Sequence, residues 1–193
     1  MSIADPLPPN GFPEAKASRS LTYHLVLLWG VFGVLALLGR ALWRLTPMAL
    51  EPILDGSLGW MHIALYVFWV IFNAYGEGYR AFQKAFCPRV VARAHHLAQN
   101  PRPFWHALLA PAYCLSLFHA NRKGLTVAWV MIACIALLVM LLRVTPQPWR
   151  GIVDGGVVVA LAWGALVLVV FAVRTLLSGE PPAAKMNLPD AKR

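Results

Sequence analysis

The chain has 193 residues, of which 59% are hydrophobic and 13% are charged, and its formal net charge is +9. A water-soluble domain of this length must cover its surface with polar groups, so this composition excludes an ordinary soluble protein. Four apolar segments each approach the roughly 20 residues that a helix needs to cross a bilayer. They cover about residues 21–43, 58–75, 125–142 and 152–173 and predict one all-α integral membrane four-helix bundle, residues 21–175.

The segments outside these spans are two tails. Residues 1–20 contain Pro6, Pro13 and Glu14 instead of a basic start with a short apolar core, so no cleavable signal peptide is expected and the first span stays as an anchor. Residues 176–193 form the second tail. Both tails are expected in the cytoplasm, with the N-terminal one disordered.

The charge of the loops predicts this orientation. Only four of the 17 lysines and arginines fall on one side of the spans, namely Arg40, Arg44, Arg143 and Arg150. The other thirteen lie on the side of both tails and of the loop at residues 76–124, which the positive-inside rule places in the cytoplasm. We therefore expect a multi-pass membrane protein with both termini and the middle loop in the cytoplasm. Its basic face would contact anionic lipids of the inner leaflet, with no need for nucleic acid.

The long middle loop is expected to be structured. The second helix should continue beyond the membrane until Pro88, which favours a break. A short amphipathic helix should follow at residues 89–98, with its basic face on the membrane surface. This face and the turn before the third span form a candidate lipid- or partner-binding set: Arg89, Arg93, His96, Arg122 and Lys123. A basic helix that only anchors the loop is the alternative.

The apolar stretch at residues 103–120 is too short for a full crossing and is interrupted by Pro111. If it crossed, the basic turn at Arg122 and Lys123 would move to the outer side, against the positive-inside rule. The stretch is therefore predicted to be an interfacial or re-entrant segment that is buried against the bundle.

Four polar residues are candidates for an intramembrane site: Asn73, Glu77, Arg80 and Asp154. Asp154 can be a proton or cation site, because ionisable groups inside a membrane are costly. It can also simply pair with Arg150, one helical turn earlier, or with Arg40. Local pairing is likewise expected for Glu77 and Arg80.

Small residues repeat every fourth position in the last span, at Gly156, Ala160 and Gly164. Such a ridge lets another helix approach closely, either inside the bundle or in an oligomer. Cys87, Cys114 and Cys134 show no Cys-x-x-Cys spacing, so neither a disulfide framework nor a zinc site is expected.

Histidines raise the alternative of a haem, for which His24 and His119 are the candidate axial ligands. Both are expected at the cytoplasmic edge and not deep in the bundle, so no cofactor is expected. His95 and His96 are adjacent and point in different directions, which disfavours a metal site with both histidines as ligands. The common phosphate-loop, serine-elbow and zinc-helix motifs are not present in the sequence, which disfavours soluble-type catalysis.

Four stretches resemble an uncharacterised family of small polytopic bacterial membrane proteins, with possible plastid relatives. They are residues 77–83 (EGYRAFQ), 88–94 (PRVVARA), 118–123 (FHANRK) and 146–159 (PQPWRGIVDGGVVV), within about residues 59–173. The resemblance implies a multi-pass protein of the bacterial inner membrane and brings no activity, ligand or catalytic residue.

These observations together favour a non-catalytic scaffold, accessory subunit or assembly factor. Its partners would be membrane lipids and other membrane protein subunits, or a second copy of the chain. A small oligomeric transporter or channel is one alternative. A histidine-ligated haem electron carrier or a lipid-modifying membrane enzyme is the other.

Overall fold

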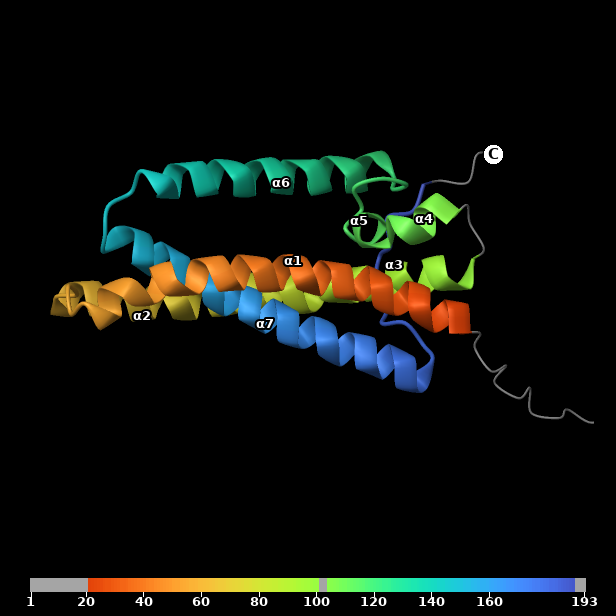
Figure 1. The fold of residues 1–193 in the computed structure, drawn as a ribbon, viewed down its shortest axis with the longest axis horizontal. Coiled ribbons are helices and arrows are strands. Elements are labelled where there is room, and N and C mark those ends of the chain that lie inside the picture. The colour runs from red at the N-terminus through yellow and green to blue at the C-terminus, as the bar shows by residue number, and fades with distance from the viewer. Residues whose placement is uncertain (1–20, 101–103, 190–193) are drawn as a thin grey trace, which may run out of the picture.

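The computed structural model describes residues 21–100 and 104–189, and this part of the chain is helical with no strand (Figure 1). The helices are α1 (Leu21–Leu54), α2 (Trp60–Asn73), the π-helix η1 (Ala74–Phe86), α3 (Cys87–Gln99), α4 (Phe104–Leu108), α5 (Ala110–Cys114), α6 (Arg122–Arg143) and α7 (Trp149–Ser178). The predicted all-α class is confirmed. The N-terminal tail, residues 1–20, and residues 190–193 of the second tail lie outside the described residues.

Three helices are long and apolar enough to cross a membrane, α1, α6 and α7, with 34, 22 and 30 residues. They coincide with three of the four predicted spans. The remaining one, at residues 58–75, coincides with α2, which has only 14 residues before the chain continues as η1 and α3. At about 1.5 Å per residue α2 alone covers about 21 Å, so a crossing here also needs the first turns of η1.

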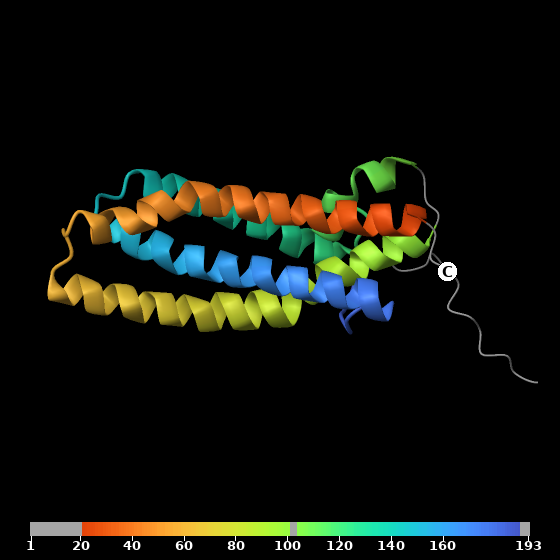
Figure 2. The ribbon, with the colours of Figure 1, turned by 60° about the horizontal axis from the view of Figure 1, so that its bottom comes forward.

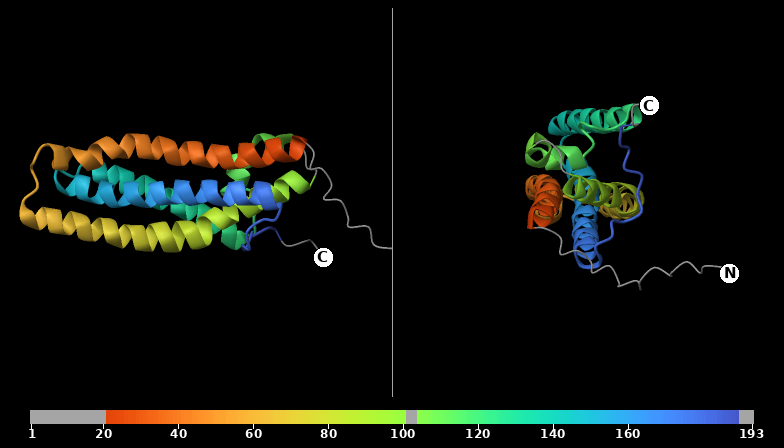
Figure 3. Two further views of the ribbon diagram at one scale, coloured as in Figure 1. Left: turned by 90° about the horizontal axis from the view of Figure 1, so that it is seen from below. Right: turned by 90° about the vertical axis from the view of Figure 1, so that its right-hand side faces the viewer.

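The core of the molecule is a layer of three long rods, in which α1, α7 and the continuous α2–η1–α3 segment lie side by side (Figure 2). Leu27 and Val34 of α1, Val91 of α3 and Leu168 of α7 are fully buried where these helices meet. Helix α6 runs parallel to this layer and apart from it, as the end-on view also shows (Figure 3).

The small-residue ridge of α7 packs inside this bundle. Gly156, Ala160 and Gly164 are all buried. A Cβ atom on Gly156 would lie 2.7 Å from the Asn73 amide nitrogen, and one on Gly164 would lie 2.5 Å from the ring of Phe82. The ridge therefore lets α2 and η1 approach α7 within one chain, which decides between the two uses that the sequence left open.

Helix α1 extends further than its predicted end near residue 43. It continues to Leu54 and contains Pro47 and Pro52. Pro52 is buried, and its ring fills the space that a side chain on Gly151 of α7 would need. This packing against α7 stabilises the last turns despite the hydrogen bonds that the two prolines remove.

The break predicted at Pro88 is absent, because the chain stays helical from η1 into α3 with Pro88 in the first turn of α3, and the rod only bends there (Figure 2). The prediction of a surface helix after it is wrong. In α3 the side chains of Val91, Arg93 and His95 are buried in addition to those on the expected apolar face. Helix α3 is covered by α1, α5 and α7, so it has little free surface for a membrane.

The stretch after residue 103 forms two helices of five residues, α4 and α5, which are too short to cross a bilayer. Helix α5 packs against α1 and α3, and the ring of Pro111 occupies the space beside Gly33 of α1. The predicted burial against the bundle holds for α5, whereas α4 has no buried residue. The start of α1, helices α3 to α5 and the end of α7 gather at one end of the molecule (Figure 3).

Candidate functional site

The centre of this end is Arg93, whose side chain is fully buried. Its Nε donates to the carbonyl of Tyr113 at 2.7 Å and its Nη1 to the carbonyl of Met186 at 2.7 Å. Its Nη2 donates to the carbonyls of His119 at 3.1 Å and Phe118 at 3.4 Å. The guanidinium also lies 4.3 Å from the centre of the Tyr113 ring. Arg93 thus joins α3, α5, the turn before α6 and the C-terminal segment, where the sequence predicted a membrane-facing side chain.

Aromatic and imidazole rings surround this arginine. The Tyr23 hydroxyl and the Nδ1 of His95 lie 2.8 Å apart, and the Nδ1 of His96 lies 3.2 Å from the Tyr113 hydroxyl. The rings of His106 and His119 meet edge to face at 5.4 Å. We call this group, with Arg93, the arginine–histidine cluster.

Both candidate haem ligands are engaged in this region. His24 contacts the ring of Tyr23 at 5.2 Å, and His119 stacks on Tyr113 at 6.0 Å. Each imidazole therefore packs against a tyrosine at this end of the bundle. The sequence predicted the location of both histidines at this edge. It did not predict that they pack against tyrosines.

The C-terminal segment is docked on the same cluster. Gly179 ends α7 with a φ of +79°, a left-handed conformation that suits glycine, and the chain then turns back. The backbone nitrogen of Asn121 donates to the carbonyl of Asn187 at 2.9 Å. Leu188 packs against the buried group formed by Leu97, Ala110 and Tyr113. Residues 186–188 are thereby part of the folded structure.

The other residues of the predicted lipid- or partner-binding set lie around this cluster. Arg89 and His96 are half-buried on α3, and Arg122 and Lys123 are exposed in the first turn of α6. Asn121 caps that turn, because its side-chain oxygen accepts a hydrogen bond from the nitrogen of Gly124 at 2.8 Å. The four side chains thus border one end of the molecule, while Arg93 lies inside it.

A second polar cluster lies at the opposite end, around Asp154 of α7. The side chain of Asp154 is almost fully buried, and its Oδ2 lies 3.6 Å from the Nε of Arg150. The expected pairing with Arg150 is confirmed, whereas Arg40 is exposed. At this distance neither of the two paired atoms has a hydrogen-bond partner within the described residues. Asp154 thus has an ionic partner and an unsatisfied oxygen.

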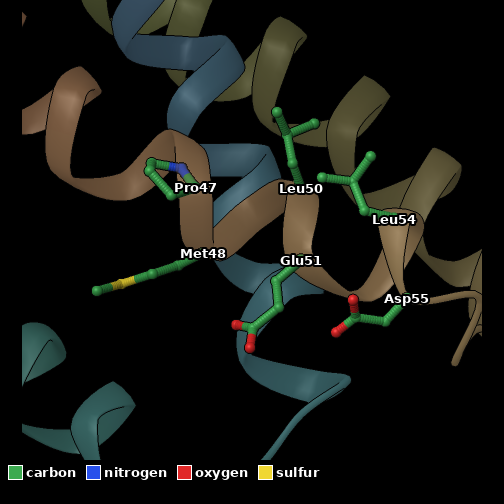
Figure 4. A pocket seen from close by; sticks show the side chains of 6 residues that line it. All are labelled: Pro47, Met48, Leu50, Glu51, Leu54 and Asp55. Atoms are coloured by element: carbon green, nitrogen blue, oxygen red, sulfur yellow. The ribbon is translucent and has the colours of Figure 1, made fainter.

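The neighbours of this pair connect the end of α1 to α7. Arg150 also points a guanidinium nitrogen at the sulfur of Met48, 2.8 Å away. Gln147 donates to the Glu51 carboxylate at 2.7 Å and accepts from the nitrogen of Gly151 at 3.0 Å. A depression of about 390 Å³ lies at the end of α1. Glu51 and Asp55 lie on one side of it, and Leu50 and Leu54 lie on the other (Figure 4). These contacts fix α1 to the start of α7.

The remaining intramembrane candidates have separate surroundings. Asn73 is buried and donates to the carbonyl of Trp69 at 2.9 Å. Glu77 and Arg80 are exposed on η1. Within the described residues they do not approach within ion-pair distance, so the expected local pairing is wrong. The π-helical turn is wider than an α-helical one, which moves residues three apart off a common face.

The structure offers little for metal or thiol chemistry. Among the described residues, no group of three or more His, Cys, Asp or Glu side chains could hold a metal ion. Cys87 is buried, and its thiol lies 3.3 Å from the carbonyl of Gly164. Cys114 is buried in α5, and burial raises the pKa of its thiol to about 12, so it is protonated at neutral pH. Cys134 on α6 is exposed.

Helix α6 is the least covered part of the described chain. Every residue from 129 to 141 is exposed, over more than three helical turns, whereas α1 and α7 each bury one side. Its ends join the bundle, and its middle stands free (Figure 1). This difference could not be predicted from the sequence, because an apolar span has the same composition beside lipid or beside protein.

No family model, curated protein or solved structure matches this chain.

Proposed function

We propose that this protein is a non-catalytic scaffold or accessory subunit, or an assembly factor, which binds another membrane protein through α6. The exposure of residues 129–141 on all sides is the observation that carries the proposal. The two polar clusters support it, because their groups are used to hold helices and segments of the chain together. Helix α6 is therefore the part of the bundle that is open to a partner in the membrane.

The outward face of α6 has the pattern of a helix-packing seam. Val130, Ala133, Leu137, Met140 and Val144 follow each other at alternating spacings of three and four residues, and all are exposed. Apolar residues at this spacing form the contact line of helices that cross at about 20°. Residues 129–142 are apolar at every position, so the exposure of these five residues, and not their spacing, marks this face as the one open to a partner helix.

The first test is photo-crosslinking from α6 in native membranes. A photoreactive residue at Leu137 is expected to give a discrete protein adduct. The same residue at Leu166 of α7 should give lipid adducts only, and this control is matched because both leucines are 68% exposed. Equal protein adducts from both positions, or none from Leu137, would contradict the proposal.

The buried Asp154 favours a transporter or channel as a second candidate, because an ionisable group with an unsatisfied oxygen in a span is a possible ion or proton site. This role predicts ion or proton flux in proteoliposomes that Asp154→Asn abolishes. Absence of flux from the well-folded protein would remove this candidate.

The cellular setting is also part of the proposal. We propose the bacterial inner membrane, with both chain ends and the arginine–histidine cluster in the cytoplasm. The charge of the loops supports this orientation. Trp43, Trp60 and Trp149 lie exposed at the opposite end, which suits a headgroup boundary there.

A further inference from the structure

The space between α6 and the bundle contains an apolar groove at the end opposite the arginine–histidine cluster. Its volume is about 430 Å³. Its walls come from three elements and the loop between two of them: Leu65 and Trp69 of α2, Leu138, Leu141 and Leu142 of α6, Thr145, and Trp149, Ile152 and Val153 of α7. The Thr145 hydroxyl, the one side-chain hydroxyl in these walls, donates to the carbonyl of Leu141 at 3.1 Å. The groove therefore presents almost only hydrocarbon.

The volume and chemistry of the groove limit what can fill it. Water is disfavoured because an ordered water needs two to four polar partners. A partner helix is too large, because an α-helix with side chains is about 10–12 Å across and would need several turns of length. A volume of about 430 Å³ is within the range of small-molecule sites. In a bilayer, the molecule of this shape that is always present is a lipid acyl chain.

The charge beside the groove points to the class of lipid. Arg143 is exposed and ends α6 directly after Leu141 and Leu142, both of which line the groove. Trp149, at the start of α7, is half-exposed in its wall, a position that suits a headgroup boundary. In the proposed orientation this end lies at the outer leaflet, and a cation next to an apolar slot there matches the phosphate and acyl chain of an anionic phospholipid.

We propose that this groove is a binding site for one anionic phospholipid, with an acyl chain between α6 and the α2–α7 pair and its phosphate near Arg143. The lipid fills the inner side of α6 and leaves the Val130–Val144 seam free. The inference is separate from the proposed partner protein, since no residue of the Val130–Val144 seam lines the groove.

The test is native mass spectrometry of the detergent-purified protein titrated with phosphatidylglycerol or with phosphatidylethanolamine. The wild type is expected to retain one phosphatidylglycerol under activation that strips other lipids. Leu138→Trp fills the groove and should weaken this binding about tenfold, which is the change produced by about 1.4 kcal/mol. Leu142→Phe is a second filling variant with a smaller added volume. Arg143→Gln should remove the preference for phosphatidylglycerol.

The matched control is Leu137→Trp, which adds the same side chain to the neighbouring position on the outward seam. It should leave lipid retention unchanged and affect only the binding of a partner protein, so the two proposals can fail separately. Equal retention by the Leu138→Trp and Leu137→Trp proteins would overturn the site. No retained lipid in the wild type would overturn it as well, and equal retention of both lipids would overturn its anionic selectivity.

Discussion

Replacing Arg93 by methionine is expected to destabilise the protein by about 3–5 kcal/mol, because several buried carbonyl groups lose their donor at once. Methionine retains the apolar volume of the arginine side chain but donates no hydrogen bond. Lysine should rescue little, since one ammonium cannot reproduce the planar fork that reaches four carbonyls in three segments. The measurement is the free energy of unfolding in detergent.

A local consequence can be measured separately from global unfolding. The C-terminal segment is held by the carbonyls of Met186 and Asn187, and the exposed Lys185 precedes them. Trypsin should therefore cut after Lys185 much faster in Arg93→Met than in the wild type, under conditions where the helices remain intact. Arg89→Met removes the same charge one turn earlier on α3 and serves as the control. If both variants are cut at the wild-type rate, Arg93 does not hold this segment.

Gly164→Ala is expected to destabilise the bundle by about 1–3 kcal/mol through overpacking. The new Cβ would lie 2.5 Å from the Phe82 ring, and η1 must move away from α7 to accept it. Gly39→Ala is the control, because a Cβ at Gly39 meets nothing within 4 Å. That change should stabilise α1 by about 0.5–1 kcal/mol through helix propensity alone.

Thermal unfolding of both glycine variants in the same detergent gives the comparison. A lower Tm for Gly164→Ala together with an equal or higher Tm for Gly39→Ala supports an internal ridge. If Gly164→Ala leaves the Tm of the single chain unchanged and instead disrupts an oligomer, the ridge acts between chains. The structure predicts the first result, since α2 and η1 already occupy the space beside the ridge.

The features that the sequence predicted are those with a local pattern. The spans follow from apolar runs of about 20 residues, and the Arg150–Asp154 pair follows from spacing by one helical turn. The ridge at Gly156, Ala160 and Gly164 could be predicted from small residues at every fourth position. The segments that pack against it, α2 and η1, could not. In each case the physical cause lies within one helix and is visible in one segment of sequence.

The environment of Arg93 could not be predicted in this way. Its acceptors are backbone carbonyls, which every residue has, and they come from positions 20 to 93 residues away in the chain. Basic residues that share one face of a helix are equally consistent with a helix on the membrane surface and with a buried side chain that donates hydrogen bonds. Tertiary packing by α1, α5 and α7 decides between them. The exposure of α6 could not be predicted for a similar reason, because lipid and protein neighbours select the same apolar residues.

The native mass of the complex, purified gently from its own membrane, tests the central claim most directly. We expect additional mass from a different protein subunit. Ala133→Trp, on the outward seam of α6, should remove that mass, while Ala136→Trp, off the seam on the same helix, should retain it. A single chain or a homo-oligomer, or loss of the partner from both variants alike, would contradict an accessory subunit that binds through this face.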